Sequence, residues 1–98
     1  MTSEKMNVLE RAINTYGETH QIDKAIEEMS ELTKALLKLR YARDGYEQDI
    51  IMDSIDEEMA DVLIMWTQLS LIFGNAFRID AWQDKKIERL ARRLDKER

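Results

Sequence analysis

The sequence predicts an all-α protein, a helical bundle of about four helices completed by oligomerisation. Three observations support this prediction. Apolar residues recur every three or four positions through most of the chain, as they do on one face of a helix. The composition has no proline, three glycines and 36% charged residues, which favours long helices over strands or disorder. The 98 residues form a single domain, 1–98, small enough that a second copy would usefully extend its core.

The first two predicted helices are amphipathic, and each ends at a break that contains glycine. The first spans about residues 3–16 and stops near Gly17. The second spans about residues 22–43 and ends at Asp44-Gly45. Their apolar stripes consist of Leu9, Ala12, Ile13 and Tyr16 in the first, and Ile22, Ile26, Met29, Leu32, Leu36 and Leu39 in the second.

The third predicted helix is apolar on nearly every side and spans about residues 54–73. Ser54, followed three residues later by Glu57, fits a capping box directly before the apolar run. Residues 48–53 fit either a preceding turn or the same helix. Gly74-Asn75 ends this helix, and a fourth amphipathic helix is expected over about residues 79–96.

Composition also excludes several classes of protein. The chain has no cysteine, so it has no disulfide, thiol nucleophile or cysteine-bound metal. Its N-terminus lacks an apolar signal core, and its longest apolar run, around residues 62–66, is too short for a membrane span. The net charge of −5 argues against nucleic-acid binding, although basic residues crowd positions 85–98. We therefore expect a soluble, cytoplasmic protein with neither a membrane nor a nucleic acid as its partner.

Two helical carboxylate motifs provide the functional hypothesis. Glu27-Glu28-x-x-Glu31 lies in the second helix, and Glu58-x-x-Asp61 lies in the third. Acidic residues three apart share a helix face, so two such helices side by side can converge four carboxylates on one divalent cation. Asp61 lies in the apolar helix, where a carboxylate needs a cation or a hydrogen-bond partner.

The helical positions of these residues sharpen the hypothesis. On the second helix, an arc of about 80° along the apolar stripe contains Gln21, Lys24, Glu28 and Glu31, with Glu27 further out. On the third, another arc of about 80° contains Glu58, Asp61 and Gln68. Two simpler interpretations remain open. The acidic residues of the second helix can form a solvated face with Lys24 and Lys34, and Glu58 can occupy an exposed first turn favoured by the helix dipole.

The order and spacing of these motifs resemble the MazG-type all-α nucleoside triphosphate pyrophosphohydrolases. The segments 21–32 and 56–62 are similar to small MazG-like proteins of phages and prophages of Gram-positive bacteria, and the resemblance covers about residues 16–94. It implies Mg²⁺-dependent hydrolysis of a nucleoside triphosphate to the monophosphate and pyrophosphate. The Mg²⁺ ligands that it implies are Glu28, Glu31, Glu58 and Asp61. Gln68 would contact the nucleotide, at a position where relatives often have asparagine.

Other residues have candidate roles around this site. Glu27 is a candidate to orient or deprotonate the attacking water, or it is simply solvated. Gln21 and Lys24 face the same way as the proposed ligands and are candidate contacts to the substrate. The segment Lys86–Arg89 is similar to the phosphate-binding segment of the family. Because Lys86 falls within the apolar stripe of the fourth helix, its ammonium reaches either an anion or, past its neighbours, water.

Two predictions concern partners. The nearly all-apolar third helix needs neighbours on every side, which predicts a homodimer or homotetramer with Trp66 and Leu69 at the interface. The same helix supports an alternative function, a non-catalytic interaction or adaptor module that binds a partner chain. His20, the single histidine, is expected in a loop.

Overall fold

The protein is all-α, as predicted. The computed structural model describes residues 1–97, and within this range it contains no strand. Its helices are α1 (Ser3–Tyr16), α2 (Glu18–Arg40), α3 (Gly45–Phe73) and α4 (Ala76–Lys96). The predicted bounds of the first helix are confirmed. The other three helices begin earlier than predicted, and α2 also ends earlier.

The link between α1 and α2 is a single glycine. Gly17 has a φ of +94°, a backbone conformation that glycine adopts without a steric penalty, and its N–H donates to the Ile13 carbonyl at 2.8 Å. The chain therefore turns within one residue and α2 starts at once at Glu18. The prediction that His20 lies in a loop was wrong, because His20 is in the first turn of α2.

The start of α3 is set by a side-chain cap at Asp44. The Asp44 carboxylate accepts a hydrogen bond from the backbone N–H of Glu47 at 2.8 Å. The Glu47 carboxylate in turn accepts from the backbone N–H of Arg43 at 3.3 Å and from its Nε at 3.0 Å. The predicted start at Ser54 was therefore wrong. Of the two interpretations of residues 48–53, the continuous helix is confirmed.

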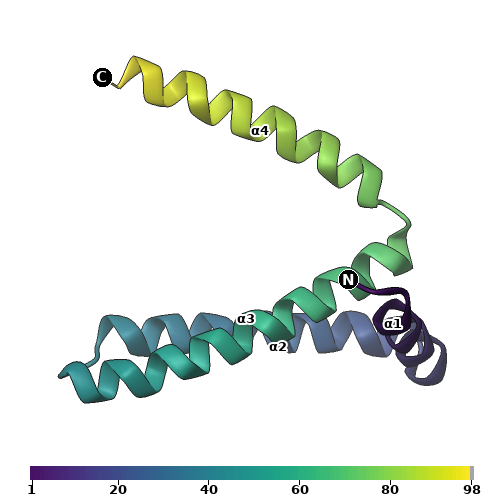
Figure 1. Ribbon diagram of the computed structural model, residues 1–98, viewed down its shortest axis with the longest axis horizontal. Helices are drawn as coiled ribbons and strands as arrows, with labels where there is room; N and C mark the ends of the chain where they lie inside the picture. Colours follow the sequence, from purple (N-terminus) through teal and green to yellow (C-terminus); the bar gives the residue numbers. More distant parts are fainter. Residues whose placement is uncertain (98) are drawn as a thin grey trace.

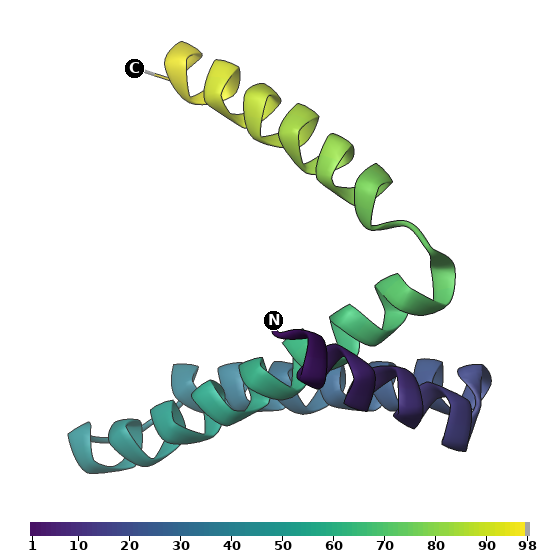
Figure 2. The same cartoon turned by 45° about the vertical axis from the view of Figure 1, so that its right-hand side comes forward.

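The body of the molecule is an antiparallel pair of long helices, α2 and α3, with α1 packed across one end (Figure 1; Figure 2). A small core near the α2–α3 loop consists of Ala35, Ile51 and Ile55, with Leu32, Leu39 and Ala42 packed against it. The remaining buried apolar residues are Leu9, Ile13, Ala25 and Met65. The α2–α3 contact is by far the largest in the chain, so it fixes the relative position of any side chains that the two helices share.

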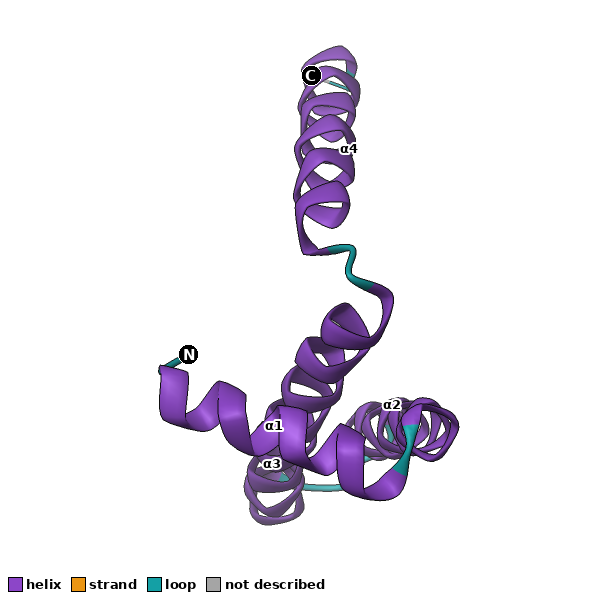
Figure 3. Cartoon of the chain, turned by 90° about the vertical axis from the view of Figure 1, so that its right-hand side faces the viewer, coloured by secondary structure: helices purple, strands orange, loops and turns teal. Residues whose placement is uncertain are grey.

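Helix α4 does not join this body. The chain bends by 117° between α3 and α4, and α4 projects away from the other helices (Figure 3). None of its residues is buried. The prediction of about four helices is confirmed for residues 1–97, but within one copy only α1, α2 and α3 pack together. Among residues 1–97 no single helix is long and apolar enough to cross a membrane; only α3 and α4 together pass that test, across their bend.

Candidate metal centre

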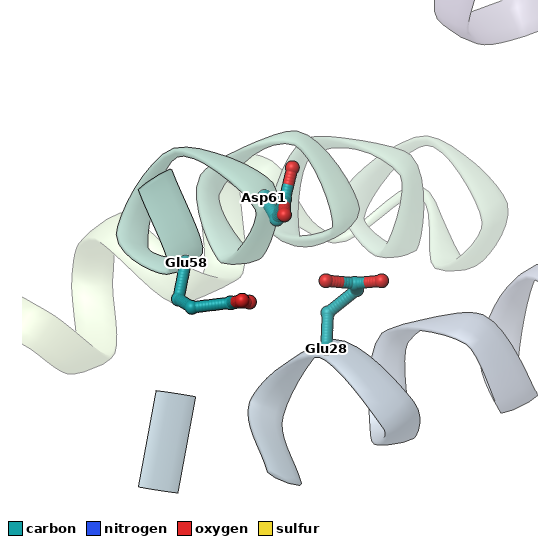
Figure 4. A group of neighbouring side chains, drawn as sticks. All are labelled: Glu28, Glu58 and Asp61. Atoms are coloured by element: carbon teal, nitrogen blue, oxygen red, sulfur yellow. The ribbon is translucent and has the colours of Figure 1, made fainter. Parts of the chain in front are cut away.

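Three carboxylates meet between α2 and α3. Glu28 projects from α2 toward Glu58 and Asp61 on α3 (Figure 4). One oxygen of each residue lies within 4.8 Å of the others, and all three residues are partly buried. The positions follow from the sequence, because Glu58 and Asp61 are one turn apart on the face of α3 that packs against α2. These are three of the four ligands that the motifs predict.

The cluster concentrates negative charge in a partly desolvated place. Burial, followed by the nearby charges of Asp61 and Glu28, raises the pKa of Glu58 above its ordinary value. Burial, followed by the charge of Glu28, likewise raises the pKa of Asp61. The Glu58 Oε2 atom is buried and has no hydrogen-bond partner. The site therefore holds a carboxylate oxygen that the residues around it do not satisfy.

Lys24 partly balances this charge from the rim. Its Nζ lies 3.1 Å from Glu28 Oε1 and 3.9 Å from Glu27 Oε1. The hydrogen bond to Glu28, followed by the charge of Glu27, raises the pKa of Lys24. Only 13% of the Glu28 side chain is exposed, against 62% for Glu27. Glu28 thus belongs to the cluster, and Glu27 stands at its solvent edge.

Glu31 lies outside the cluster. Its Oε1 atom pairs instead with Lys34 Nζ at 3.4 Å, an ion pair within α2 that is largely exposed. Its negative charge still contributes to the raised pKa of Glu58, and both residues line a small hollow of about 230 Å³. The structure therefore does not bring the fourth predicted ligand together with the other three, although Glu31 is near enough to influence them electrostatically.

A larger hollow of about 480 Å³ opens beside the carboxylates. This volume is within the range of small-molecule binding sites. Its lining comes from the end of α1, the first three turns of α2 and the middle of α3, and consists of Tyr16, His20, Gln21, Lys24, Glu27, Glu28, Asp61, Ile64, Met65 and Gln68. Gln21, Lys24 and Gln68, which the sequence predicted to face a substrate, all lie here.

Two aromatic residues of this hollow, Tyr16 and His20, are not among the site residues predicted from the sequence. The rings of Tyr16 and His20 lie 5.4 Å apart between centroids, with an interplanar angle of 31°. The helical spacing of His20, Lys24 and Glu28 could have identified the histidine, since residues four apart on a helix share a face. The prediction that placed His20 before the helix concealed this pattern.

The basic residues predicted to bind phosphate are not at this site within one chain. Lys86 and Arg89 are exposed on α4, the helix that projects away from α2 and α3 (Figure 1). They line a separate shallow hollow on α4 together with Trp82, Lys85, Glu88 and Arg92. Their proposed role therefore cannot be filled in the arrangement of a single copy.

No protein-family model, curated protein or solved structure shows a significant match to this chain.

Proposed function

We propose that this protein is a Mg²⁺-dependent nucleoside triphosphate pyrophosphohydrolase, which converts a nucleoside or deoxynucleoside triphosphate to the monophosphate and pyrophosphate. The unpartnered Glu58 Oε2 within the three-carboxylate cluster is the observation that supports it most. Gathering like charges in a partly desolvated place is unfavourable unless a cation joins them. The MazG-like order and spacing of the acidic motifs supplies the reaction class.

The donor set fits a hard divalent cation. In an octahedral Mg²⁺ site with bonds of about 2.1 Å, neighbouring and opposite ligand oxygens lie about 3.0 and 4.2 Å apart. The oxygens of Glu28, Glu58 and Asp61 lie within 4.8 Å of one another, so rotations of these side chains would bring them to such separations. These three residues would hold the ion. Glu31 would become a fourth ligand by leaving its exposed ion pair with Lys34.

The side chains around the cluster would position the substrate and the attacking water and would supply charge. Mg²⁺, when bound, supplies charge neutralisation for the pyrophosphate leaving group and a more acidic water. Lys24 holds the Glu28 carboxylate in place, and the exposed Glu27 at the rim is placed to orient the attacking water. The 480 Å³ hollow receives the nucleoside, with Gln21 and Gln68 in its wall.

A homodimer or homotetramer is part of this proposal. Residues 1–75 contain seven basic and fifteen acidic residues, a net charge of −8, whereas residues 76–98 contain eight basic and five acidic residues, a net charge of +3. The α4 helix of one copy is thus electrostatically complementary to the acidic body of another. In such an assembly Lys86 and Arg89 would reach the triphosphate bound to a neighbouring copy. Within their own copy they lie away from the site.

An adaptor without catalytic activity is the second candidate. The observation in its favour is the exposed apolar surface of α3 and α4, in which Trp66 is 52% exposed, Phe77 88% and Trp82 61%. Such a surface is typical of a protein-binding face. This candidate leaves the unpartnered oxygen of Glu58 without a role, so we rank it second.

Pyrophosphate release by the purified chain separates the two candidates. Normal and modified nucleoside triphosphates are incubated with the protein in Mg²⁺ and, as the control, in a chelator. We expect release of pyrophosphate and the monophosphate from at least one nucleotide in Mg²⁺ only. A complete absence of turnover across the panel, in Mg²⁺ and in Mn²⁺, would favour the adaptor.

A further inference from the structure

Two glutamines are buried against each other between α2 and α3. Gln21 and Gln68 are each only 4% exposed, and Gln21 Nε2 donates a hydrogen bond to Gln68 Oε1 at 2.7 Å. They are the only polar residues among the buried residues of the described chain, 1–97. A pair of apolar side chains of similar size would pack there without needing a partner, so stability alone does not explain the amides.

The protonation of His20 at Nδ1 sets the direction of this pair. Its Nδ1 atom lies 2.8 Å from Gln21 Oε1. With the Gln21 oxygen toward the ring, Nδ1 is the protonated nitrogen and donates, whereas the other tautomer of His20 would accept from the Gln21 nitrogen and reverse the chain. Gln21 is then oriented with its nitrogen toward Gln68, whose oxygen accepts. The chain of donors therefore runs from His20 through Gln21 to Gln68.

This chain of hydrogen bonds leaves the Gln68 amide nitrogen as its free end. Among residues 1–97 no oxygen accepts a hydrogen bond from this nitrogen, and it is not one of the buried side-chain atoms that lack a partner. Gln68 also lines the 480 Å³ hollow. Its Nε2 group is thus a donor that the hollow can present to a ligand as long as His20 is protonated at Nδ1.

The position of this donor suits a nucleobase. Gln68 lies seven residues after Asp61 on α3, which is about 10 Å along the helix at 1.5 Å per residue. That separation leaves room for a sugar and an α-phosphate between a base at Gln68 and a cation at Asp61. Tyr16 and His20 add aromatic surface to the wall of the same hollow. Aromatic rings of this kind stack on bases of any identity, so the hydrogen bond is what can discriminate between them.

We propose that His20, protonated at Nδ1, and Gln21 position the Gln68 amide as a donor, so that the hollow selects bases with a carbonyl oxygen over bases with an amino group at the same place. The inference rests on the proposed function for the presence of a nucleotide. Gln68 is the specificity-determining residue, and His20 and Gln21 are positioning residues that act through it. Reversing the amide would place an acceptor toward the base and invert the preference.

Two matched pairs of nucleotides test this selectivity without catalysis. dIMP and dAMP carry a carbonyl and an amino group, respectively, at position 6 of the purine, and dUMP and dCMP differ in the same way at position 4 of the pyrimidine. Each is titrated into the ¹⁵N-labelled full chain with Mg²⁺, and the side-chain amide signals of Gln68 and Gln21 are followed. We expect the carbonyl member of at least one pair to bind about five- to tenfold more tightly and to shift the Gln68 amide signals, as one added neutral hydrogen bond would do.

Variants assign the roles. The isosteric Gln68→Glu should abolish or invert the preference, because a carboxylate accepts where the amide donates. His20→Ala, at an exposed position, should reduce the preference without unfolding the chain, and His20→Gln, which again offers an N–H donor, should restore it. Gln48→Leu, an exposed glutamine on the same helix, is the control and should change nothing.

Two outcomes would overturn the inference. One is equal binding of both members in both pairs, and the other is a preference for the carbonyl member that survives Gln68→Glu and His20→Ala. Because binding is read directly, a chain that binds the carbonyl bases selectively but releases no pyrophosphate would refute the proposed function and leave the selectivity intact. Release of pyrophosphate without any preference between the paired bases would support the proposed function and refute the selectivity.

Discussion

The α2–α3 pair and α4 contrast in what surrounds them within one chain. Between α2 and α3 lie the main apolar core, the buried amide pair and the three-carboxylate cluster. Helix α4 has no buried residue, although its apolar stripe includes Leu90 and Leu94, which are 46% and 54% exposed. Most helical stability in proteins comes from packing of the apolar face, which the 21 residues of α4 lack within one chain.

The contrast has a functional meaning. In our proposal the α2–α3 pair supplies three carboxylates for a cation but has only Lys24 as a positive group near the triphosphate, whereas α4 has positive groups and an unpacked apolar face. Each region supplies what the other lacks. Within one chain the bend at Gly74 keeps them apart, and in the proposed homo-oligomer a second copy would bring them together.

The largest effect should come from Asp61, a carboxylate of the cluster between α2 and α3. Asp61→Asn removes ligand charge and should lower turnover by about a hundredfold or more, in line with the loss on removing groups of a metal site. The fold should remain intact or become more stable, since the buried charge is removed. Steady-state kinetics at limiting Mg²⁺ and thermal denaturation measure the two effects. Asp53→Asn, an exposed carboxylate on the same helix, is the control, and unchanged activity in Asp61→Asn would show that Asp61 is not a ligand.

Self-association should depend on the outer face of α3. This face has an exposed apolar stripe formed by Met52, Met59, Leu63, Trp66 and Phe73. If it is the centre of an oligomer, Trp66→Ala should weaken association by about thirtyfold, the effect of truncating one interface hot spot. Light scattering across a concentration series measures this. Tyr46→Ala, which removes an exposed aromatic ring near the other end of α3, should not change it. A wild-type chain that is monomeric at micromolar concentration contradicts the prediction.

Lys86 tests whether α4 serves the site of another copy. Lys86→Met should raise KM or lower kcat by about tenfold, the effect of losing one charge-assisted contact to phosphate. Mixing this variant with Asp61→Asn should then restore about a quarter of wild-type activity, because half of the randomly formed dimers have one intact site. Lys96→Met, at the end of the same helix, is the control. Wild-type kinetics in Lys86→Met would leave α4 with a structural role only.

The sequence predicted more about the α2–α3 pair than about α4. The bounds of α1, the α2–α3 cluster and the facing of Gln21 and Gln68 all followed from helical periodicity and from Gly17. Periodicity gives the direction of a side chain around its helix, but it does not give the depth at which two helices cross. Glu31 therefore shared an arc with Glu28 in the sequence but pairs with Lys34 in the structure.

Two further features, the start of α3 and the direction of α4, also depend on local geometry that helical periodicity does not give. The predicted start of α3 rested on the capping box at Ser54, but the Asp44–Glu47 cap begins the helix earlier in the chain. The apolar stripe of α4 showed that this helix needs a packing partner, but a stripe does not identify the partner. Nothing in the sequence indicated that α4 would leave its own bundle, because the direction of the chain after Gly74 depends on the left-handed backbone at that residue, where φ is +58°.

The smallest expected effect is a pH dependence that belongs to the carboxylate cluster alone. Burial raises the pKa of both Glu58 and Asp61 in the folded chain, whereas in the unfolded chain such groups titrate near about 4. A raised folded pKa favours the protonated form, so these groups stabilise the fold fully below the unfolded pKa. That contribution is lost as the pH rises through the folded pKa.

Without divalent cations, the melting temperature of the wild type relative to that of Glu58→Gln/Asp61→Asn should therefore fall by a few degrees, roughly, between about pH 4 and pH 7. Mg²⁺ should reverse the fall at pH 7 in the wild type only, because the ion binds the ionised carboxylates of the folded state. Differential scanning calorimetry in a chelator and in Mg²⁺ measures both. A melting-temperature difference that does not change with pH would mean that burial does not disfavour the ionised cluster. If Mg²⁺ has no effect on the melting temperature either, the α2–α3 pair has a structural role and is not a cation site.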